Sequence, residues 1–227
     1  MAGRRADAHD GLQQPDGARG QALLRSADPP ARGDAAARDR CHGAAGVGVS
    51  SGPAPLRKIG RYRLHTLRST LWVPAPPAEV WPFFADAHNL PLLVPPFLKF
   101  RILTPAPIEM RVDARIDYRL SLRGLPLRWR TRIERWQPPF AFADEQERGP
   151  YARWFHLHTF AAEGGGTGLG DEVEFAVGGG PLSPLLTRWF VLPDVLRIFR
   201  HRLERIAERF GGDPRQGKVW LADAATA

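Results

Sequence analysis

Two histidines and two nearby polar residues are the side chains in this sequence best suited to chemistry. His156 and His158 stand two positions apart, and Asp144 and Gln146 have the same spacing in the preceding segment. In an extended chain, residues two positions apart lie on one face. A hairpin turning at Gly149–Pro150 would therefore place the two pairs side by side on neighbouring strands.

Asp171 or Glu172, in the following segment, extends this polar group on its other side. Four roles for the group stay open. The side chains hydrogen-bond to one another and hold the strand register, or they orient a bound ligand. A carboxylate beside an imidazole raises the pKa of the imidazole, so acid–base catalysis by His156 or His158 with Asp144 is a third role. A metal site is the fourth, but without a third histidine or a cysteine nearby we predict no metal and no cofactor.

The segments around this group alternate in polarity as β-strands do. Apolar and polar residues alternate over 116–123, and Gly124 turns the chain into a second alternating run at 125–136. Such runs joined by short turns predict antiparallel hairpins. Further strands are predicted at 61–73, 99–103, 140–147, 151–162 and 170–177, with a short helix at 77–86 and one helical turn plus a connector at 88–96.

A long C-terminal helix is predicted after the last strand. Apolar residues recur every three or four positions from Leu185 to Phe210, which is the spacing of one helix face. Ser183 is the expected N-cap, Pro184 the first helical residue, and Gly211 the end. Pro193 should kink or divide the helix. A half-buried sheet and an amphipathic helix each need a covering partner, so we expect them to pack together.

Aromatic residues are concentrated in the predicted sheet and in the C-terminal helix. They either fill an ordinary core or line a cavity left between a curved sheet and a single helix. With the polar group they complete a candidate ligand-binding set, which comprises Tyr118, Trp129, Asp144, Gln146, Trp154, His156, His158, Phe160 and Phe199.

The first 60 residues differ in composition from the rest of the chain. All 7 Trp, all 12 Phe and all 3 Tyr residues follow this segment. A chain rich in Ala, Gly, Arg, Asp and Pro buries too little apolar surface to offset its ordering entropy. We predict a disordered leader at 1–60, or a start codon assigned too far upstream, then one domain at 61–212 and a tail at 213–227.

Cysteine usage and hydropathy indicate the compartment. The single cysteine, Cys41, excludes an intramolecular disulfide framework. No segment has the apolar core of a signal peptide or the roughly 18 consecutive apolar residues of a membrane span. We therefore expect a cytoplasmic protein.

The formal net charge of +8 is spread along the chain, so we expect no nucleic-acid partner. Arginines predicted on the outer faces of the first long hairpin and of the helix form a solvated surface or contact an anionic membrane. They are Arg119, Arg123, Arg128, Arg130, Arg132, Arg188, Arg197, Arg200, Arg205 and Arg209.

Four motifs resemble the SRPBCC superfamily of START-like, helix-grip proteins, in particular its bacterial ligand-binding and polyketide cyclase/dehydrase-like branch. They are STLWVPAPPAEVWPFFADAHNLPLLVPP at 69–96, FxDEQxxGPYxxWxHxHxF at 142–160, GTxxxDxVEF at 166–175 and VLRIFRHRLERI at 195–206. The resemblance implies an α+β fold in which a curved, seven-stranded antiparallel sheet wraps around a long C-terminal helix, with two short helices after the first strand. It also implies a deep hydrophobic cavity.

The resemblance assigns no catalytic residues, and this fold hosts many functions. Our first hypothesis is that the protein encloses an apolar small molecule, such as a lipid, isoprenoid or polyketide-like compound, as a carrier or sensor. The alternative is a cyclase or dehydratase that uses His156 or His158 with Asp144. The third is a protein that attaches to a membrane surface.

Overall fold

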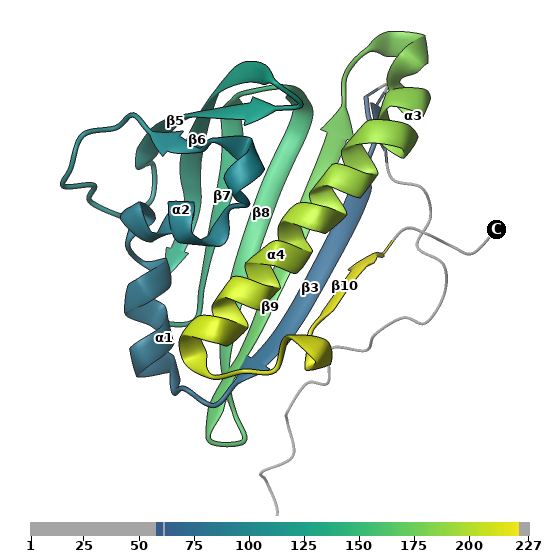
Figure 1. Cartoon of the computed structure of the whole chain (residues 1–227). Coiled ribbons are helices and arrows are strands. Elements are labelled where there is room, and N and C mark those ends of the chain that lie inside the picture. The colour runs from purple at the N-terminus through teal and green to yellow at the C-terminus, as the bar shows by residue number, and fades with distance from the viewer. Residues whose placement is uncertain (1–57, 61, 223–227) are drawn as a thin grey trace, which may run out of the picture. The chain divides into compact units, whose positions relative to one another are not determined.

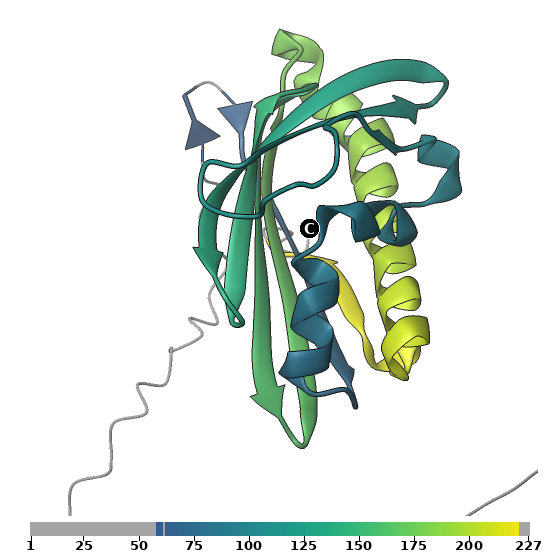
Figure 2. The ribbon, with the colours of Figure 1, turned by 90° about the vertical axis from the view of Figure 1, so that its left-hand side faces the viewer.

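The structure is a computed structural model that describes residues 58–60 and 62–222. One antiparallel sheet of eight strands, in the order β10-β3-β9-β8-β7-β6-β5-β4, carries the helices on one face (Figure 1, Figure 2). Its strands are β3 (His65–Val73), β4 (Arg101–Ile102), β5 (Arg115–Leu122), β6 (Leu125–Gln137), β7 (Ala141–Arg148), β8 (Tyr151–Glu163), β9 (Gly166–Val177) and β10 (Lys218–Leu221). A separate antiparallel pair is formed by β1 (Lys58–Ile59) and β2 (Tyr62–Arg63).

The predicted α+β fold is confirmed, with one strand more in the sheet than the seven expected. The additional strand is β10, which lies in the segment predicted as a tail and pairs with β3. Its four residues, KVWL, are too few to show a period, and the free edge of β3 supplies their hydrogen bonds. The disorder predicted for the leader lies, apart from residues 58–60, outside the described residues.

The chain between β3 and β4 forms the two short helices that the sequence predicts. The first is α1 (Pro77–Phe84), with Pro77 in the first turn, where its missing N–H removes no helical hydrogen bond. The second is α2 (Leu90–Leu93). Short 3₁₀ turns, η1 (Ala87–Asn89) and η2 (Pro96–Leu98), connect these helices to each other and to β4.

The long C-terminal helix, α4 (Leu192–Phe210), crosses the sheet diagonally (Figure 1). It ends at Gly211, whose left-handed φ of 76° suits a residue without a Cβ. The helical run is divided near Pro193 as expected, because a π-helical segment, η4 (Thr187–Val191), separates α4 from α3 (Ser183–Leu186). Within the described residues, no helix is long and apolar enough to cross a membrane.

Two details of the predicted helix are wrong. Ser183 is the first residue of α3, not its N-cap, and its hydroxyl donates a hydrogen bond to the Val177 carbonyl at 2.7 Å. The predicted apolar stripe is buried only within α4, since Leu185 and Trp189 are 55% and 60% exposed. Leu185 and Trp189 are exposed because α3 and η4 lie at the end of the sheet, past the strands that cover α4 (Figure 1).

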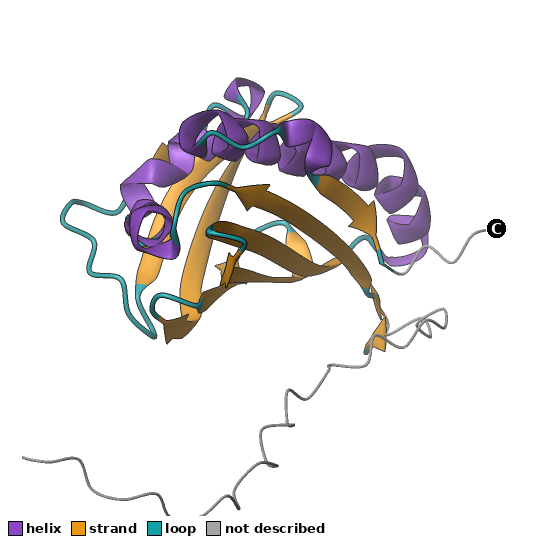
Figure 3. Cartoon of the chain, turned by 90° about the horizontal axis from the view of Figure 1, so that it is seen from below, coloured by secondary structure: helices purple, strands orange, loops and turns teal. Residues whose placement is uncertain are grey.

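The sheet curves beneath the helices (Figure 3). Register shifts interrupt the pairing of β6 with β7 at Arg130/Thr131 and between Ile133 and Arg135. Another shift lies at the start of the β8–β9 pairing. Bulges of this kind bend a strand and increase its twist, so the sheet encloses space on the side of the helices.

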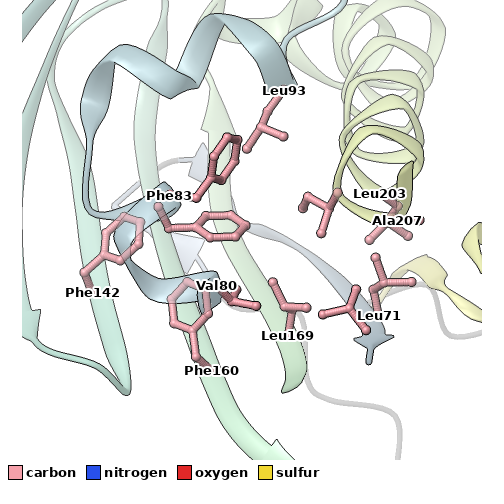
Figure 4. Packing of buried hydrophobic residues seen from close by; sticks show 12 residues of the cluster. Leu71, Val80, Phe83, Leu93, Phe142, Phe160, Leu169, Leu203 and Ala207 are labelled. Carbon is pink, nitrogen blue, oxygen red and sulfur yellow. The ribbon is translucent and has the colours of Figure 1, made fainter. Parts of the chain in front are cut away.

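Aromatic side chains fill the interior next to α1. We call this cluster the aromatic core; Figure 4 shows part of it, and its rings are those of Trp81, Phe83, Phe84, Phe142 and Phe160. Phe160 of β8 lies 4.9 Å from the Phe84 ring and 5.4 Å from the Trp81 ring, centroid to centroid. Edge-to-face packing of this kind adds stability beyond the burial of apolar area.

Candidate functional site

A cavity of about 220 Å³ lies beside the aromatic core, bounded by β5, β6, β7, β8, α2 and α4. Most of its lining is apolar and includes Leu90, Leu93, Leu98, Phe100, Ile116, Leu120, Leu122, Leu127, Ile133 and Ile198. An engineered apolar cavity of about 150 Å³ is large enough to bind benzene. The space here therefore accommodates a small organic molecule.

Strand alternation places the apolar wall of the cavity. In the β5–β6 hairpin, Leu120 lies directly opposite Leu127, and Tyr118 lies opposite Trp129. Residues two positions apart on a strand share a face, so the face that the sequence predicted to be apolar turns inward. The rings of Tyr118 and Trp129 stack with their centroids 6.0 Å apart.

One wall of the cavity is polar, and we call it the polar wall. It consists of Asp144 from β7, His156 and His158 from β8, Asp171 from β9 and Arg202 from α4, and all of them except Asp171 line the cavity directly. The strand register brings the first four together, because Asp144 is opposite His156 and Asp171 is opposite His158. The predicted hairpin at Gly149–Pro150 thus does join Asp144 to both histidines.

Asp171 connects the members of the polar wall. Its Oδ1 lies 3.0 Å from His156 Nε2 and 2.9 Å from His158 Nδ1. The hydroxyl of Ser69 and the Nε of Arg202 donate to its Oδ2 at 2.8 and 3.4 Å. Burial acts to raise the pKa of Asp171, but Arg202 and the two histidines outweigh it and hold that pKa well below its usual value. Asp171 is therefore ionised and acts only as an acceptor.

His156 is held in its neutral form. Burial, and then the neighbouring His158, lower the pKa of His156 from 6.5 to about 4. A neutral imidazole has one N–H and one lone pair, and the carboxylate of Asp171 accepts from Nε2. The lone pair is therefore on Nδ1, which lies 3.9 Å from Asp144 Oδ2.

Arg202 of the polar wall was not predicted from the sequence. It is only 6% exposed although it carries a charge, and its Nη2 lies 3.1 Å from His158 Nδ1. Its guanidinium also lies 5.4 Å from the centre of the Phe84 ring. The sequence did indicate that Arg202 is buried. It follows Phe199 by three positions and precedes Ile206 by four, so it lies inside the apolar stripe of the helix.

A second hydrogen-bonded group lies on the cavity wall at Thr131. Its Oγ1 is 2.8 Å from the Tyr118 hydroxyl and accepts the indole N–H of Trp129 at 3.1 Å. Burial, assisted by the negative charge of Asp144, raises the pKa of Tyr118 well above its usual value. The Tyr118 phenol therefore keeps its proton and stays neutral.

The predicted ligand-binding residues fall into two groups. Those that line the cavity are Tyr118, Trp129, Asp144, Trp154, His156, His158 and Phe199. Gln146 and Phe160 do not. The Gln146 amide donates to the Tyr151 carbonyl at 2.8 Å and accepts from its N–H at 3.2 Å, so it fastens the β7–β8 turn. Phe160 packs in the aromatic core.

Glu172, offered as an alternative to Asp171, points away from this group and pairs with Arg68 at 2.8 Å on an exposed surface. Several arginines predicted for an open basic face are also ion-paired. Arg130 contacts Asp117 at 2.8 Å, and Arg123 contacts Asp194 at 2.9 Å. These pairs reduce the net positive field of the hairpin.

Asp144, His156 and His158 also have the spacing of a metal site. Each offers one ligand atom, and these atoms lie within 4.8 Å of one another. The bonds from Asp171 to the opposite ring nitrogens resemble the outer contacts that orient metal-binding histidines. The absence of a metal therefore stays a prediction.

Solved structures share this fold. The Zhui aromatase/cyclase from a Streptomyces species has a TM-score of 0.54 at 20% identity, over 65% of this chain and 94% of that chain. A protein of Chromobacterium violaceum has a TM-score of 0.51 at 18% identity, over 65% and 98% of the two chains. A START superfamily protein from Mycobacterium smegmatis has a TM-score of 0.50 at 14% identity, over 65% and 97%.

At these identities the likeness concerns the fold alone. None of the curated proteins compared with this chain matches it. A family model described as polyketide cyclase / dehydrase and lipid transport matches residues 73–204, from the end of β3 into α4. This match spans more than half of the chain and includes the cavity strands and the polar wall. The chain therefore belongs to the polyketide cyclase/dehydrase and lipid transport family, which is of the SRPBCC type.

Proposed function

We propose that this protein binds a compact apolar molecule in the cavity between α4 and the sheet, as a carrier or sensor. The observation that carries the proposal is the cavity of about 220 Å³ with its predominantly apolar wall. Transferring an apolar ligand from water to such a wall is favourable by roughly 25 cal/mol per Å² of buried area. The family description, which names both cyclases and lipid transport, supports the same class of ligand.

The volume of the cavity limits the size of the ligand. Drug-sized ligands occupy pockets of about 300–1,000 Å³, and the cavity here is smaller, at about 220 Å³. A molecule of one or two rings, or a short isoprenoid, matches this volume better than a long acyl chain. Aromatic side chains on the wall, among them Trp129 and Trp154, suit a flat ring system.

The direct test is to purify the full chain, extract it with organic solvent and analyse the extract by mass spectrometry. Native mass spectrometry of the same preparation measures the stoichiometry. We expect one compact apolar molecule per chain, or one-to-one binding of an apolar fluorescent probe to the extracted protein. A preparation that carries no ligand and binds no probe contradicts the proposal.

A matched pair of variants on β6 locates the binding. Leu127→Trp fills the cavity, whereas Leu125→Trp makes the same change two residues away at a side chain that is 68% exposed. We expect Leu127→Trp to weaken probe binding by about tenfold or more, because the added ring occupies the ligand volume. Leu125→Trp should bind as the wild type does. Equal binding by both variants places the probe elsewhere and overturns the assignment.

Catalysis is a second candidate, favoured by the neutral imidazole of His156. A general base must be unprotonated and within reach of substrate, and His156 lines the cavity with its pKa lowered to about 4. A cyclase or dehydratase would use His156 or His158 with Asp144. If turnover of a substrate is found, the double variant His156→Gln/His158→Gln should abolish it; retained turnover excludes these histidines as the base.

Attachment to a membrane surface is a third candidate, favoured by exposed apolar residues near α3. Leu182, Leu185, Trp189 and Phe190 are between 45% and 62% exposed, and Arg188 lies 5.8 Å from the Trp189 ring. Aromatic and basic residues together suit an anionic lipid interface. Sedimentation with anionic vesicles at low salt should carry the wild type and lose Trp189→Ser; failure of the wild type to sediment excludes this role.

A further inference from the structure

The polar wall places two hydrogen-bond acceptors next to each other at the cavity, Asp144 and His156 Nδ1. His156 donates its Nε2 proton to Asp171 at 3.0 Å, so Nδ1 is an acceptor. Asp144 Oδ2 lies 3.9 Å from that Nδ1, too far for a direct hydrogen bond. Within the described part of the chain, no hydrogen bond to His156 Nδ1 is found. Two acceptors thus face each other without a proton between them.

Asp144 has fewer partners than a carboxylate in its position calls for. Its side chain is only 16% exposed, and its side-chain partner among the described residues is His158 Nε2, at 3.3 Å. A carboxylate has about four acceptor sites, and a buried acceptor without a donor is destabilising. Asp144 lines the cavity, so a donor on a bound molecule can reach it.

Several donors of the cavity wall are engaged within the protein. The indole N–H of Trp129 goes to Thr131, which also contacts the Tyr118 hydroxyl. Arg202 donates through Nε to Asp171, and its Nη2 contacts His158. A donor group on the ligand, by contrast, meets two neighbouring acceptors, Asp144 and His156 Nδ1.

From this arrangement we infer the chemical class of the ligand: a compact apolar ring compound with a hydroxyl or other hydrogen-bond donor, which donates to Asp144 with His156 Nδ1 as the second acceptor. The inference rests on the proposed binding function and deepens it. Each part of the cavity then has its own role in binding. The apolar wall provides affinity, and the acceptor pair selects ligands that carry a donor.

Three naphthalene derivatives of similar size test this class. 2-Naphthol carries a donor, 2-methylnaphthalene replaces the hydroxyl by a methyl group, and 2-methoxynaphthalene keeps the oxygen without its proton. Their dissociation constants are measured by displacement of a fluorescent probe from the full chain, once with and once without a chelator. A hydrogen bond to a charged group contributes about 1.5–3 kcal/mol. We expect 2-naphthol to bind at least about tenfold more tightly than either analogue.

Asp144→Asn and Asp117→Asn form the matched variants. Both remove one carboxylate from the sheet, but Asp117 pairs with Arg130 and does not line the cavity. We expect Asp144→Asn to reduce the preference for 2-naphthol to within about threefold of the analogues, while 2-methylnaphthalene binds unchanged. Asp117→Asn should keep the full preference. Unchanged binding of 2-methylnaphthalene also shows that the cavity of the variant is intact.

The outcomes separate this inference from the proposed function. If no compound binds the wild type, the proposed function fails. If all three bind equally, or the methoxy compound binds most tightly, the binding function stands and the donor inference is overturned. If 2-naphthol is preferred only without the chelator, the preference is due to a metal at Asp144, His156 and His158. That result also overturns the donor inference. If Asp144→Asn does not fold, the wild-type comparison of the three compounds still decides.

Discussion

The aromatic core and the cavity occupy neighbouring parts of one interior, between the same sheet and the same helices, yet one is filled and the other is hollow. Phe142 stands at the boundary. Its ring lies 6.2 Å from Phe160 in the aromatic core and stacks on His158 of the polar wall at 4.1 Å. The two regions thus share strands, and in part side chains, but differ in what faces them.

The difference follows from the elements opposite the sheet. Opposite the aromatic core, α1 presents Phe83 and Phe84, and the Phe84 ring reaches Phe160 of β8 at 4.9 Å while both rings form the near edge of the cavity. Opposite the cavity, α2 is a single turn whose leucines are shorter. Inward-facing residues on a strand therefore become core or cavity wall according to the length of the side chains across from them.

Phe160→Ala should be the most damaging change, because it removes a ring from the filled region. Truncation of a buried Phe to Ala costs about 3–5 kcal/mol, and Phe160 is 4% exposed. The free energy of unfolding from urea titration, followed by tryptophan fluorescence, measures the loss. Phe140→Ala is the control, since Phe140 is 69% exposed and should cost little. A similar small loss at both positions would show that the aromatic core is not tightly packed.

Acid should weaken the polar wall before it affects the aromatic core. The pKa of His156 is about 4 in the folded protein, below the 6.5 of an ordinary histidine, so the unfolded chain binds the proton more readily. The stabilisation that the neutral His156 gives the folded protein is fully present above pH 6.5 and is lost between pH 6.5 and about 4. It amounts to about 3 kcal/mol of the free energy of unfolding. Asp171, whose pKa is lowered below 3.8, adds a further loss at more acidic pH.

Urea titrations across this pH range measure that acid effect. His156→Gln should flatten the profile between pH 6.5 and 4, because the group that takes up the proton is gone. Phe160→Ala should shift the whole curve downward without changing its slope. A wild-type profile that is flat in this window contradicts the neutral, buried state of His156.

Two leucine truncations compare the regions with the side-chain chemistry held constant. Leu203→Ala removes a side chain of the filled cluster that is 5% exposed and should cost about 3 kcal/mol. Leu120→Ala removes a partly exposed side chain of the cavity wall and should cost about 1 kcal/mol, because the leucine already borders empty space. Equal losses in urea titration would mean that the cavity is packed as tightly as the core.

Arg123→Ala should have the smallest effect. Arg123 joins the β5–β6 hairpin to α4 through Asp194 at 2.9 Å, and its side chain is 50% exposed. Surface ion pairs contribute about 0–1 kcal/mol, so we expect the midpoint of urea unfolding to change little. A loss comparable to that of Phe160→Ala would show that the cavity rim, rather than the aromatic core, limits stability.

Much of the site was predictable because strand periodicity fixes which residues share a face. Asp144, His156 and His158 were grouped correctly from their spacing and from one turn. Gln146 has the same spacing as Asp144, but it lies near the turn, where the backbone of Tyr151 captures its amide. Phe160 shares the histidine face of β8, but it lies under α1 instead of beside the cavity.

Periods of two and of about 3.6 residues are enough to predict the order of the strands along the chain, the apolar face of the long helix and the inward face of β8. Three features could be known only from the folded chain: Arg202 reaches Asp171 and His158, β10 completes the sheet, and the space beneath α2 stays open. These features arise from contacts between segments far apart in the chain, and local patterns do not encode how much volume such segments leave between them.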